Sequence, residues 1–213
     1  MPDFKGFPGC FCIKLGRVLE PACGDGNFLS EILSRKLAVV RQRYKKSPYD
    51  YERNAILALT SIYGVDILAD NAQSCRQRLF EQWDREYTDA CGRDANDEAR
   101  RAARFILDKN IVCGNALSMM CVDENQRDTD KYITFTEWTF PANDARIKRR
   151  EYRLDVLLRE NDDPHAYEAQ MSLFADDIGS ENNWMIDPET KEAVPRPIRE
   201  YPPVNYRRLG EHE

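Results

Sequence analysis

The sequence predicts an α/β fold with a doubly wound, mostly parallel sheet, in a single domain that ends in an irregular C-terminal tail. Short apolar runs alternate with amphipathic helices along the first half of the chain, and that alternation is typical of a parallel sheet. A Gly-x-Gly turn joins the first predicted strand to the first predicted helix, and an acidic residue ends the second predicted strand. The 213 residues have the length of one domain with a sizeable core.

The first predicted strand and helix follow an N-terminal arm, residues 1–16, which is rich in Gly and Phe and has no clear periodicity. Residues 17–20 predict a short strand. Apolar residues then recur at helical spacing over residues 28–40, with polar residues on the opposite face. Ser47-Pro48 ends that helix, and residues 53–59 predict a short second helix.

The alternation continues through a second and a third strand. Residues 61–67 predict a strand that ends in an acid, and Asp70 is a suitable N-cap for the helix that follows, with apolar residues at helical spacing to residue 83. Residues 94–107 predict another amphipathic helix, and residues 110–113 predict the third strand. We therefore expect at least three parallel strands.

The pattern weakens beyond residue 120. Residues 131–140 alternate enough for a strand, and residues 151–159 are either helical or extended. The end of the chain is rich in Pro, Asp, Glu and Asn from residue 175 onward, a composition that disfavours a packed core. We thus predict a cofactor-binding domain over residues 17–160 and an extended C-terminal segment over residues 161–213.

The composition excludes several classes of protein. Charged residues make up 32% of the chain, and no apolar run approaches the ~20 residues of a membrane span. The N-terminus lacks the basic-then-apolar pattern of a signal peptide, so the sequence predicts a cytoplasmic protein without a membrane partner. The seven cysteines form no CxxC pair, and with two histidines no metal site is expected. Scattered cysteines of this kind are usually buried and inert.

The charge does not favour unaided binding to DNA. The formal net charge is −6, whereas affinity for DNA rests largely on neutralising phosphates. Basic clusters follow the first predicted helix and recur later, but such runs are more often solvated faces. The two clusters are Arg35, Lys36, Arg41, Arg43, Lys45 and Lys46, and then Arg146, Lys148, Arg149, Arg150 and Arg153.

The turn after the first strand is the most informative stretch. Its two glycines permit a sharp turn and a close approach of a ligand to the backbone. A dinucleotide-binding loop would carry a third glycine and present helix N-terminal amides to a pyrophosphate. This loop instead carries two carboxylates, which suit the ammonium and sulfonium groups of S-adenosylmethionine. The string is Val18-Leu19-Glu20-Pro21-Ala22-Cys23-Gly24-Asp25-Gly26-Asn27-Phe28.

This string resembles the cofactor motif of class I S-adenosylmethionine-dependent methyltransferases, in the form typical of DNA adenine amino-methyltransferases of restriction-modification systems. The resemblance covers residues 17–120 and implies a Rossmann-like fold with S-adenosyl-L-methionine as cofactor. It implies that Asp66, after the second strand, accepts both ribose hydroxyls. It also implies that Asn115, where the family usually has Asp, accepts from the adenine amino group. The cofactor-binding residues expected on this basis are Glu20, Ala22, Gly24, Asp25, Gly26, Asn27, Phe28, Asp66, Ile67, Asn115 and Ala116.

The catalytic motif of that family is missing. Methylation of an adenine amino group requires a flipped base whose amine is oriented by a side chain and a proline carbonyl, and whose ring stacks on an aromatic residue. The family encodes this as Asn, Asp or Ser, then Pro-Pro, then Tyr or Phe. The only Pro-Pro here is Pro202-Pro203, followed by Val204. The sequence therefore names no catalytic residue.

Three functions remain open. The first is an adenine-specific DNA methyltransferase-like protein of restriction-modification or mobile-element type, with DNA as its partner. The second is a non-catalytic, cofactor-binding remnant or regulatory subunit, whose partner protein supplies catalysis or target recognition. The third is a methyltransferase that acts on protein or on a small molecule. In each of them Gly26 is expected to leave the space that the methionine half of the cofactor needs.

Overall fold

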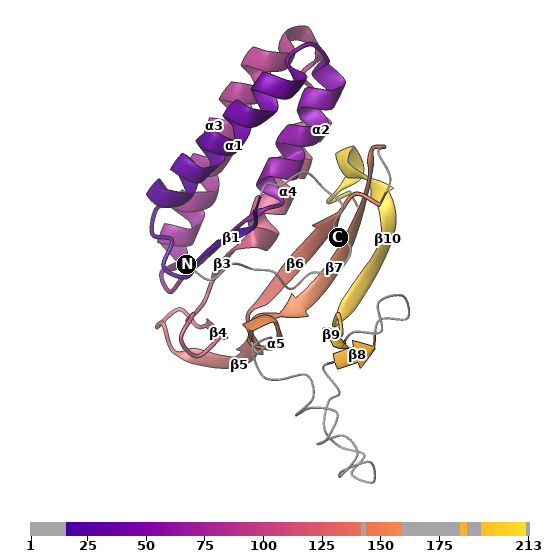
Figure 1. Ribbon diagram of the computed structural model, residues 1–213. Coiled ribbons are helices and arrows are strands. Elements are labelled where there is room, and N and C mark those ends of the chain that lie inside the picture. The colour runs from indigo at the N-terminus through magenta and orange to yellow at the C-terminus, as the bar shows by residue number, and fades with distance from the viewer. Residues whose placement is uncertain (1–15, 142–143, 159–183, 187–192, 212–213) are drawn as a thin grey trace.

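The computed structural model describes residues 16–141, 144–158, 184–186 and 193–211 (Figure 1). These residues form a mixed α/β structure, as predicted. Its parallel sheet consists of β1 (Val18–Glu20), β2 (Ile62–Asp66) and β3 (Ile111–Cys113), in the order β1-β2-β3. The three predicted strands are thus present within a residue or two of their expected bounds. The expected N-terminal arm lies almost entirely outside the described residues.

Four helices form the connections between these strands: α1 (Asn27–Tyr44), α2 (Pro48–Leu59), α3 (Ala69–Cys91) and α4 (Asp97–Asn110), with a 3₁₀ turn, η1 (Gly92–Asp94), before α4. The start of α2 is set by Ser47, whose side chain accepts from the backbone N–H of Asp50 at 3.3 Å, and by Pro48 in the first turn. Ser47-Pro48 therefore ends one helix and begins the next. For this reason α2 is longer than the predicted 53–59.

The third helix begins one residue before Asp70. Its N-cap is Leu68, which makes no side-chain cap bond, and Asp70 lies in the first turn. The prediction that Asp70 is the N-cap was wrong by two residues. At its other end α3 extends to Cys91, because Trp83, Tyr87 and Cys91 continue the buried face beyond residue 83.

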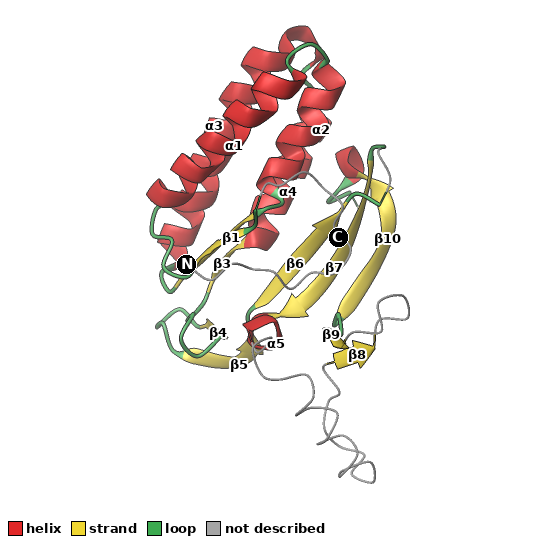
Figure 2. Cartoon of the chain, in the orientation of Figure 1, coloured by secondary structure: helices red, strands yellow, loops and turns green. Residues whose placement is uncertain are grey.

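The core lies on both faces of the parallel sheet. Every residue of β2 is buried. Ile62 joins the larger core cluster, which includes the inner faces of the four helices, whereas Tyr63 and Val65 join a smaller cluster with Phe135 from the C-terminal half. This alternation follows the two-residue period of a strand. Figure 2 shows α1–α4 gathered on one side and most C-terminal strands on the other.

The C-terminal half forms a second sheet. Strands β6 (Thr134–Thr139), β7 (Arg146–Arg153) and β10 (Arg199–Asn205) are antiparallel, in the order β10-β7-β6, and a 3₁₀ turn, η3 (Tyr206–Arg208), follows β10. The smaller elements are the pair β4 (Met120–Val122) and β5 (Asp128–Tyr132), the short helix α5 (Leu154–Leu158), and the pair β8 (Trp184–Ile186) and β9 (Ala193–Pro195).

The doubly wound sheet is not observed within the described ranges. The parallel sheet has three strands wound in one direction, and the later strands pair with one another instead of joining it. The short connections β4–β5 and β6–β7 account for this, because strands joined by a few residues pair antiparallel, and a parallel pair needs a long crossover.

The predicted irregular tail is also wrong for the described end of the chain. Residues 199–205 form a strand, Tyr206 is fully buried in the larger core cluster, and Leu209 is buried beside it. The end of the chain is therefore part of the folded core. The rest of the predicted C-terminal segment falls mostly outside the described residues.

No described helix has the length and apolar character needed to cross a membrane.

Candidate functional site

The loops that follow β1, β2 and β3 meet at the carboxyl edge of the parallel sheet. Asp66, the last residue of β2, is buried and connects all three. Its side-chain Oδ2 accepts from the backbone N–H of Gly24 at 2.8 Å, and its backbone carbonyl accepts from the N–H of Gly114 at 2.8 Å. The structure therefore brings together the three motifs that the sequence places on separate strands. In parallel α/β sheets this edge is where ligands bind.

Residues 23–26, here called the glycine turn, connect β1 to α1. Gly24 has φ +52° and Gly26 has φ +88°, both in the left-handed region that favours glycine. The N–H of Cys23 donates to the carbonyl of Val65 at 2.9 Å, and the N–H of Gly26 donates back to the carbonyl of Cys23 at 2.9 Å. The turn is thus fixed by backbone bonds to β2 and within itself.

The two glycines face different surroundings. A Cβ at Gly24 would have no heavy atom within 4 Å, so open space adjoins the turn at this point. A Cβ at Gly26 would lie 2.7 Å from Sγ of Cys75, in α3. The expectation that Gly26 leaves space for the cofactor is therefore wrong. Its missing side chain makes room for α3, whereas the space beside Gly24 is open.

Asp25 and Asn27 bind an arginine of α3. Arg78 pairs with Oδ2 of Asp25 at 2.6 Å and donates to Oδ1 of Asn27 at 2.9 Å. Asp25, expected to face the positive groups of the cofactor, is already neutralised by this guanidinium. In the part of the chain that the structure describes, the second acid of the loop, Glu20, accepts only a weak 3.3 Å bond from the N–H of Ala22. Glu20 is therefore the carboxylate better placed to meet a cation.

The carboxylate of Asp66 is largely engaged by the protein. Its Oδ2 accepts from the Gly24 N–H. Its Oδ1 accepts from the N–H of Leu68 at 3.0 Å and from Nδ2 of Asn71 at 3.1 Å. A carboxylate oxygen has two acceptor positions, so Oδ1 is filled and Oδ2 retains one. Asn71, which the sequence pattern did not indicate, orients Asp66 from the first turn of α3.

Asn115 shapes the loop after β3. Its Oδ1 accepts from the N–H of Leu117 at 3.0 Å, and its Nδ2 donates to Asp128 at 3.0 Å. Its backbone also bridges to Met120, which places it at the base of the β4–β5 hairpin. The amide oxygen retains one acceptor position for a ligand amino group. Ala116 packs against the smaller core cluster.

Three large apolar side chains are exposed near this edge, one after each strand. Phe28 is 38% exposed, Ile67 39% and Leu117 94%. Phe28 and Ile67 belong to the predicted site, and Leu117 was missed. Apolar side chains around a few polar groups are the usual lining of a site for a ring-bearing small molecule.

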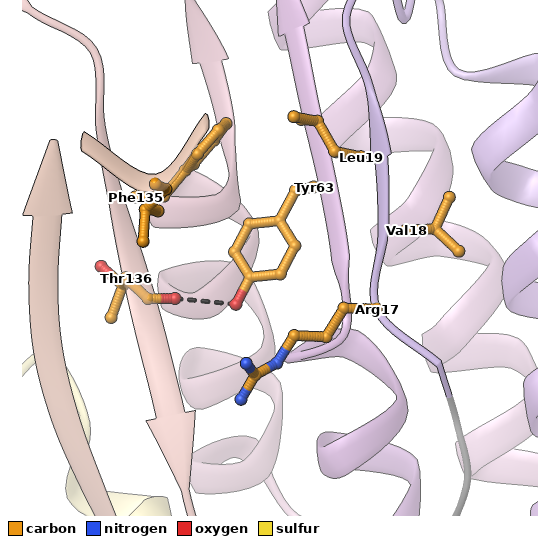
Figure 3. Close-up of a pocket in the computed structure, with 7 residues that line it drawn as sticks. Arg17, Val18, Leu19, Tyr63, Phe135 and Thr136 are labelled. Carbon is orange, nitrogen blue, oxygen red and sulfur yellow. Dashed lines mark hydrogen bonds between the residues drawn. The ribbon is translucent and has the colours of Figure 1, made fainter. Parts of the chain in front are cut away.

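A separate, small apolar pocket lies between β1, β2 and β6 (Figure 3). The hydroxyl of Tyr63 points across it and donates to the carbonyl of Thr136 at 2.8 Å. None of the predicted cofactor residues lines this pocket. It is therefore distinct from the carboxyl-edge site.

The side chains of the second basic cluster contact other residues of the same chain. The cluster lies on β7. Lys148 lies 2.5 Å from Glu200, and the guanidinium of Arg149 lies 3.4 Å from the ring centre of Tyr201. Within the first cluster, Lys36 is buried and donates to the carbonyl of Gly16 at 2.6 Å, and this burial lowers its pKa to about 8.

Comparison of the chain with known protein families, with characterised proteins and with solved structures finds no match. In the part of the chain that the structure describes, no three potential metal ligands gather into a cluster.

Proposed function

We propose that this protein binds S-adenosyl-L-methionine at the carboxyl edge of its parallel sheet. The observation that carries the proposal is the pair of hydrogen bonds by which Asp66 joins Gly24 and Gly114. These bonds connect the Gly-x-Gly turn, the strand-end acid and the Gly-Asn turn, which are the three motifs of the class I methyltransferase resemblance. The open space beside Gly24 is where a ligand can approach the backbone.

The chemistry of the surrounding groups fits the cofactor. Glu20 would meet its positively charged groups, and the remaining acceptor position on Oδ2 of Asp66 would receive one ribose hydroxyl. The exposed side chains of Ile67 and Leu117 would cover the adenine ring. The cofactor supplies an electrophilic methyl group. The protein's residues bind and orient the nucleoside and the amino-acid ends.

The resemblance extends the proposal to DNA methylation. We propose an adenine-specific, methyltransferase-like protein of restriction-modification or mobile-element type, whose parallel sheet corresponds to one half of a doubly wound, Rossmann-like sheet. The extension to DNA methylation rests on the sequence of residues 18–28, which includes the glycine turn. A cytoplasmic location is part of the same proposal.

A second candidate is a non-catalytic, cofactor-binding subunit. The observation that favours it is the position of Pro202-Pro203. These prolines lie in β10 of the antiparallel sheet, where the pairing register shifts between Tyr201 and Val204, and both are exposed. The one Pro-Pro of the chain thus belongs to a different sheet from the carboxyl edge. A partner protein would then supply the groups that orient the target base.

Methyl transfer distinguishes the two candidates. The purified protein is incubated with radiolabelled S-adenosyl-L-methionine and unmethylated bacterial DNA, alone and together with the products of neighbouring genes. Label in the adenine amino group when the protein acts alone supports the methyltransferase. Cofactor binding without labelling, or labelling only with a partner, supports the subunit.

Replacing Asp66 with asparagine is expected to weaken cofactor binding more than tenfold. The amide cannot accept from both sides, so either the Gly24 N–H or the α3 donors lose their acceptor, and a charge-assisted bond of about 1.5–3 kcal/mol is lost. Calorimetry with S-adenosylhomocysteine measures the affinity. Because Asp66 also holds the loops together, a lower melting temperature is expected as well.

The matched control is Asp70→Asn, four residues further along. Asp70 is exposed in the first turn of α3, and its side chain accepts from the adjacent N–H of Asn71. Its replacement should leave the affinity within twofold of the wild type, about 0.4 kcal/mol. Equal affinities for both variants and the wild type would remove Asp66 from the site.

A further inference from the structure

The loop after β3 brings a second carboxylate to the carboxyl edge of the parallel sheet. The backbone N–H of Gly114 donates to the carbonyl of Asp66 at 2.8 Å, and the next residue is Asn115. Nδ2 of Asn115 donates to Oδ1 of Asp128, the first residue of β5, at 3.0 Å. The β4–β5 hairpin continues the chain beyond this edge (Figure 1). Asp128 is therefore held against the loop that adjoins Asp66.

The carboxylate of Asp128 is open to a ligand. Asp128 is exposed, and within the described ranges the bond from Asn115 is the one hydrogen bond that its side chain makes, without an ion pair. Each carboxylate oxygen has two acceptor positions, so both positions on Oδ2 are unused by the described residues. By contrast, Oδ1 of Asp66 is filled, and Asp25 is paired with Arg78.

Two exposed apolar side chains lie on the loops beside this polar pair. Leu117 is 94% exposed, and its backbone N–H donates to Oδ1 of Asn115 at 3.0 Å. Ile67 is 39% exposed, and its carbonyl accepts from Sγ of Cys113 at 3.6 Å, which joins the loop after β2 to the end of β3. Apolar side chains next to a few fixed polar groups suit a flat ring that carries an amino group.

We propose that Asp128 determines the specificity of the site for adenine, by accepting a hydrogen bond from the 6-amino group of the cofactor, and that Asn115 positions the carboxylate. The proposal rests on the proposed function. A charged acceptor bonds an amino group more strongly than the neutral amide oxygen of Asn115 does. Asn115 instead contributes its Nδ2 as the donor that holds Asp128. The sequence pattern did not indicate Asp128, which lies 13 positions further along the chain.

The bond from Asn115 fixes which atom the Asp128→Asn variant would present to a ligand. The amide of that variant has one acceptor atom, and Nδ2 of Asn115 requires an acceptor at the place of Oδ1. The NH₂ group then takes the place of Oδ2. This group donates and cannot accept. It should therefore oppose the amino group of adenine and bind the 6-oxo group of hypoxanthine.

Calorimetry on the full-length protein compares S-adenosylhomocysteine with S-inosylhomocysteine, which has a 6-oxo group in place of the 6-amino group. We expect the wild type to bind S-adenosylhomocysteine about tenfold or more tightly than S-inosylhomocysteine, because the 6-oxo group cannot donate to Asp128. In Asp128→Asn the affinity for S-adenosylhomocysteine should fall about tenfold, as for the loss of one bond to a charged group. The affinity for S-inosylhomocysteine should stay equal or rise.

The matched control is Asp130→Asn. Asp130 is exposed two residues further along β5, so this variant removes the same charge from the same hairpin. It should keep the wild-type preference for S-adenosylhomocysteine. Asn115→Ala, in which Asp128 loses its donor, should lower the preference. An unchanged preference in Asn115→Ala overturns the positioning role of Asn115.

The outcomes separate this inference from the proposed function. An unchanged preference in Asp128→Asn, with S-adenosylhomocysteine still bound, overturns the role of Asp128 and leaves the proposed function in place. An equal loss of affinity for both compounds also overturns that role, because Asp128 then supports the hairpin and does not distinguish the rings. If the wild type binds neither compound, the proposed function fails, and the role of Asp128 fails with it.

Discussion

Replacing Glu52 with alanine is expected to lower the free energy of unfolding by about 3–5 kcal/mol. Glu52 is 1% exposed in α2 and accepts hydrogen bonds from Tyr206 at 2.6 Å and Tyr87 at 2.5 Å. Without the carboxylate these two buried hydroxyls lose their charged acceptor, at about 1.5–3 kcal/mol each. Arg207 also bonds Glu52 at 2.6 Å, but its side chain is 34% exposed and adds less. Chemical denaturation measures the change.

The control is Glu124→Ala, at an exposed loop position, whose free energy of unfolding should stay within about 0.5 kcal/mol of the wild-type value.

The pH dependence of the free energy of unfolding provides a second test of Glu52. Burial alone would raise the pKa of Glu52, but Arg207 and the two tyrosine hydroxyls bring it below its ordinary value of 4.5. The stabilisation is therefore complete above pH 4.5 and is lost as the pH falls below it. In Glu52→Gln the free energy of unfolding should fall less steeply as the pH is lowered below 4.5. The same pH dependence in the variant and the wild type would contradict the role of the charge.

Replacing Gly26 with alanine is expected to destabilise the ligand-free protein by about 2–5 kcal/mol. The left-handed φ of +88° costs a side chain about 1–2 kcal/mol. Its Cβ would also stand 2.7 Å from Sγ of Cys75, which is fully buried, and overpacking of this kind costs about 1–3 kcal/mol. Thermal and denaturant unfolding without ligand measure the loss.

Gly24→Ala is the matched control, because Gly24 also has a positive φ but no neighbour within 4 Å of a Cβ. It should cost only the backbone strain, about 1–2 kcal/mol. In the Gly26→Ala background, Cys75→Ala removes the closest atom and should restore part of the stability. Equal losses at both glycines, with no coupling to Cys75, would show that the turn does not press against α3.

The first half of the fold could be predicted because its determinants are local. Strands at residues 18–20, 62–66 and 111–113 each come before or after a helix whose apolar residues recur at helical spacing. Their order in the sheet also follows from the chain, since each crossover adds the next strand beside the last. Only helix ends differed: Ser47 and Pro48 set the start of α2, and α3 begins after Leu68, which makes no side-chain cap bond.

The second half could not be predicted because its determinants are distant in sequence. Strand β7 appears as a basic cluster, and its charges are matched by Glu200 and Tyr201, about fifty residues later. Tyr206 bonds Glu52 across 154 positions. Pro and acidic residues in the last segment suggested a chain without a core. The pairing of β10 with β7 supplies the partners that composition does not show.

The candidate site was predicted in outline and corrected in detail. The meeting of the glycine turn, Asp66 and the Gly114 turn follows from parallel strands ending at one edge. What surrounds Gly24 and Gly26 could not be predicted from the strand pattern, because it depends on where α3 packs. The same packing places Arg78 against Asp25 and Cys75 beneath Gly26.

Isothermal titration of the full-length protein with S-adenosylhomocysteine tests whether the carboxyl edge of the parallel sheet binds the cofactor. We expect a single saturable site, competition by S-adenosyl-L-methionine, and at least tenfold weaker binding to Asp66→Asn than to Asp70→Asn. At a ligand concentration of about a hundred times the dissociation constant, the wild type should gain about 2.7 kcal/mol of stability. No heat of binding and no change in melting temperature with either compound at millimolar concentration would contradict the assignment of the carboxyl edge as a cofactor site.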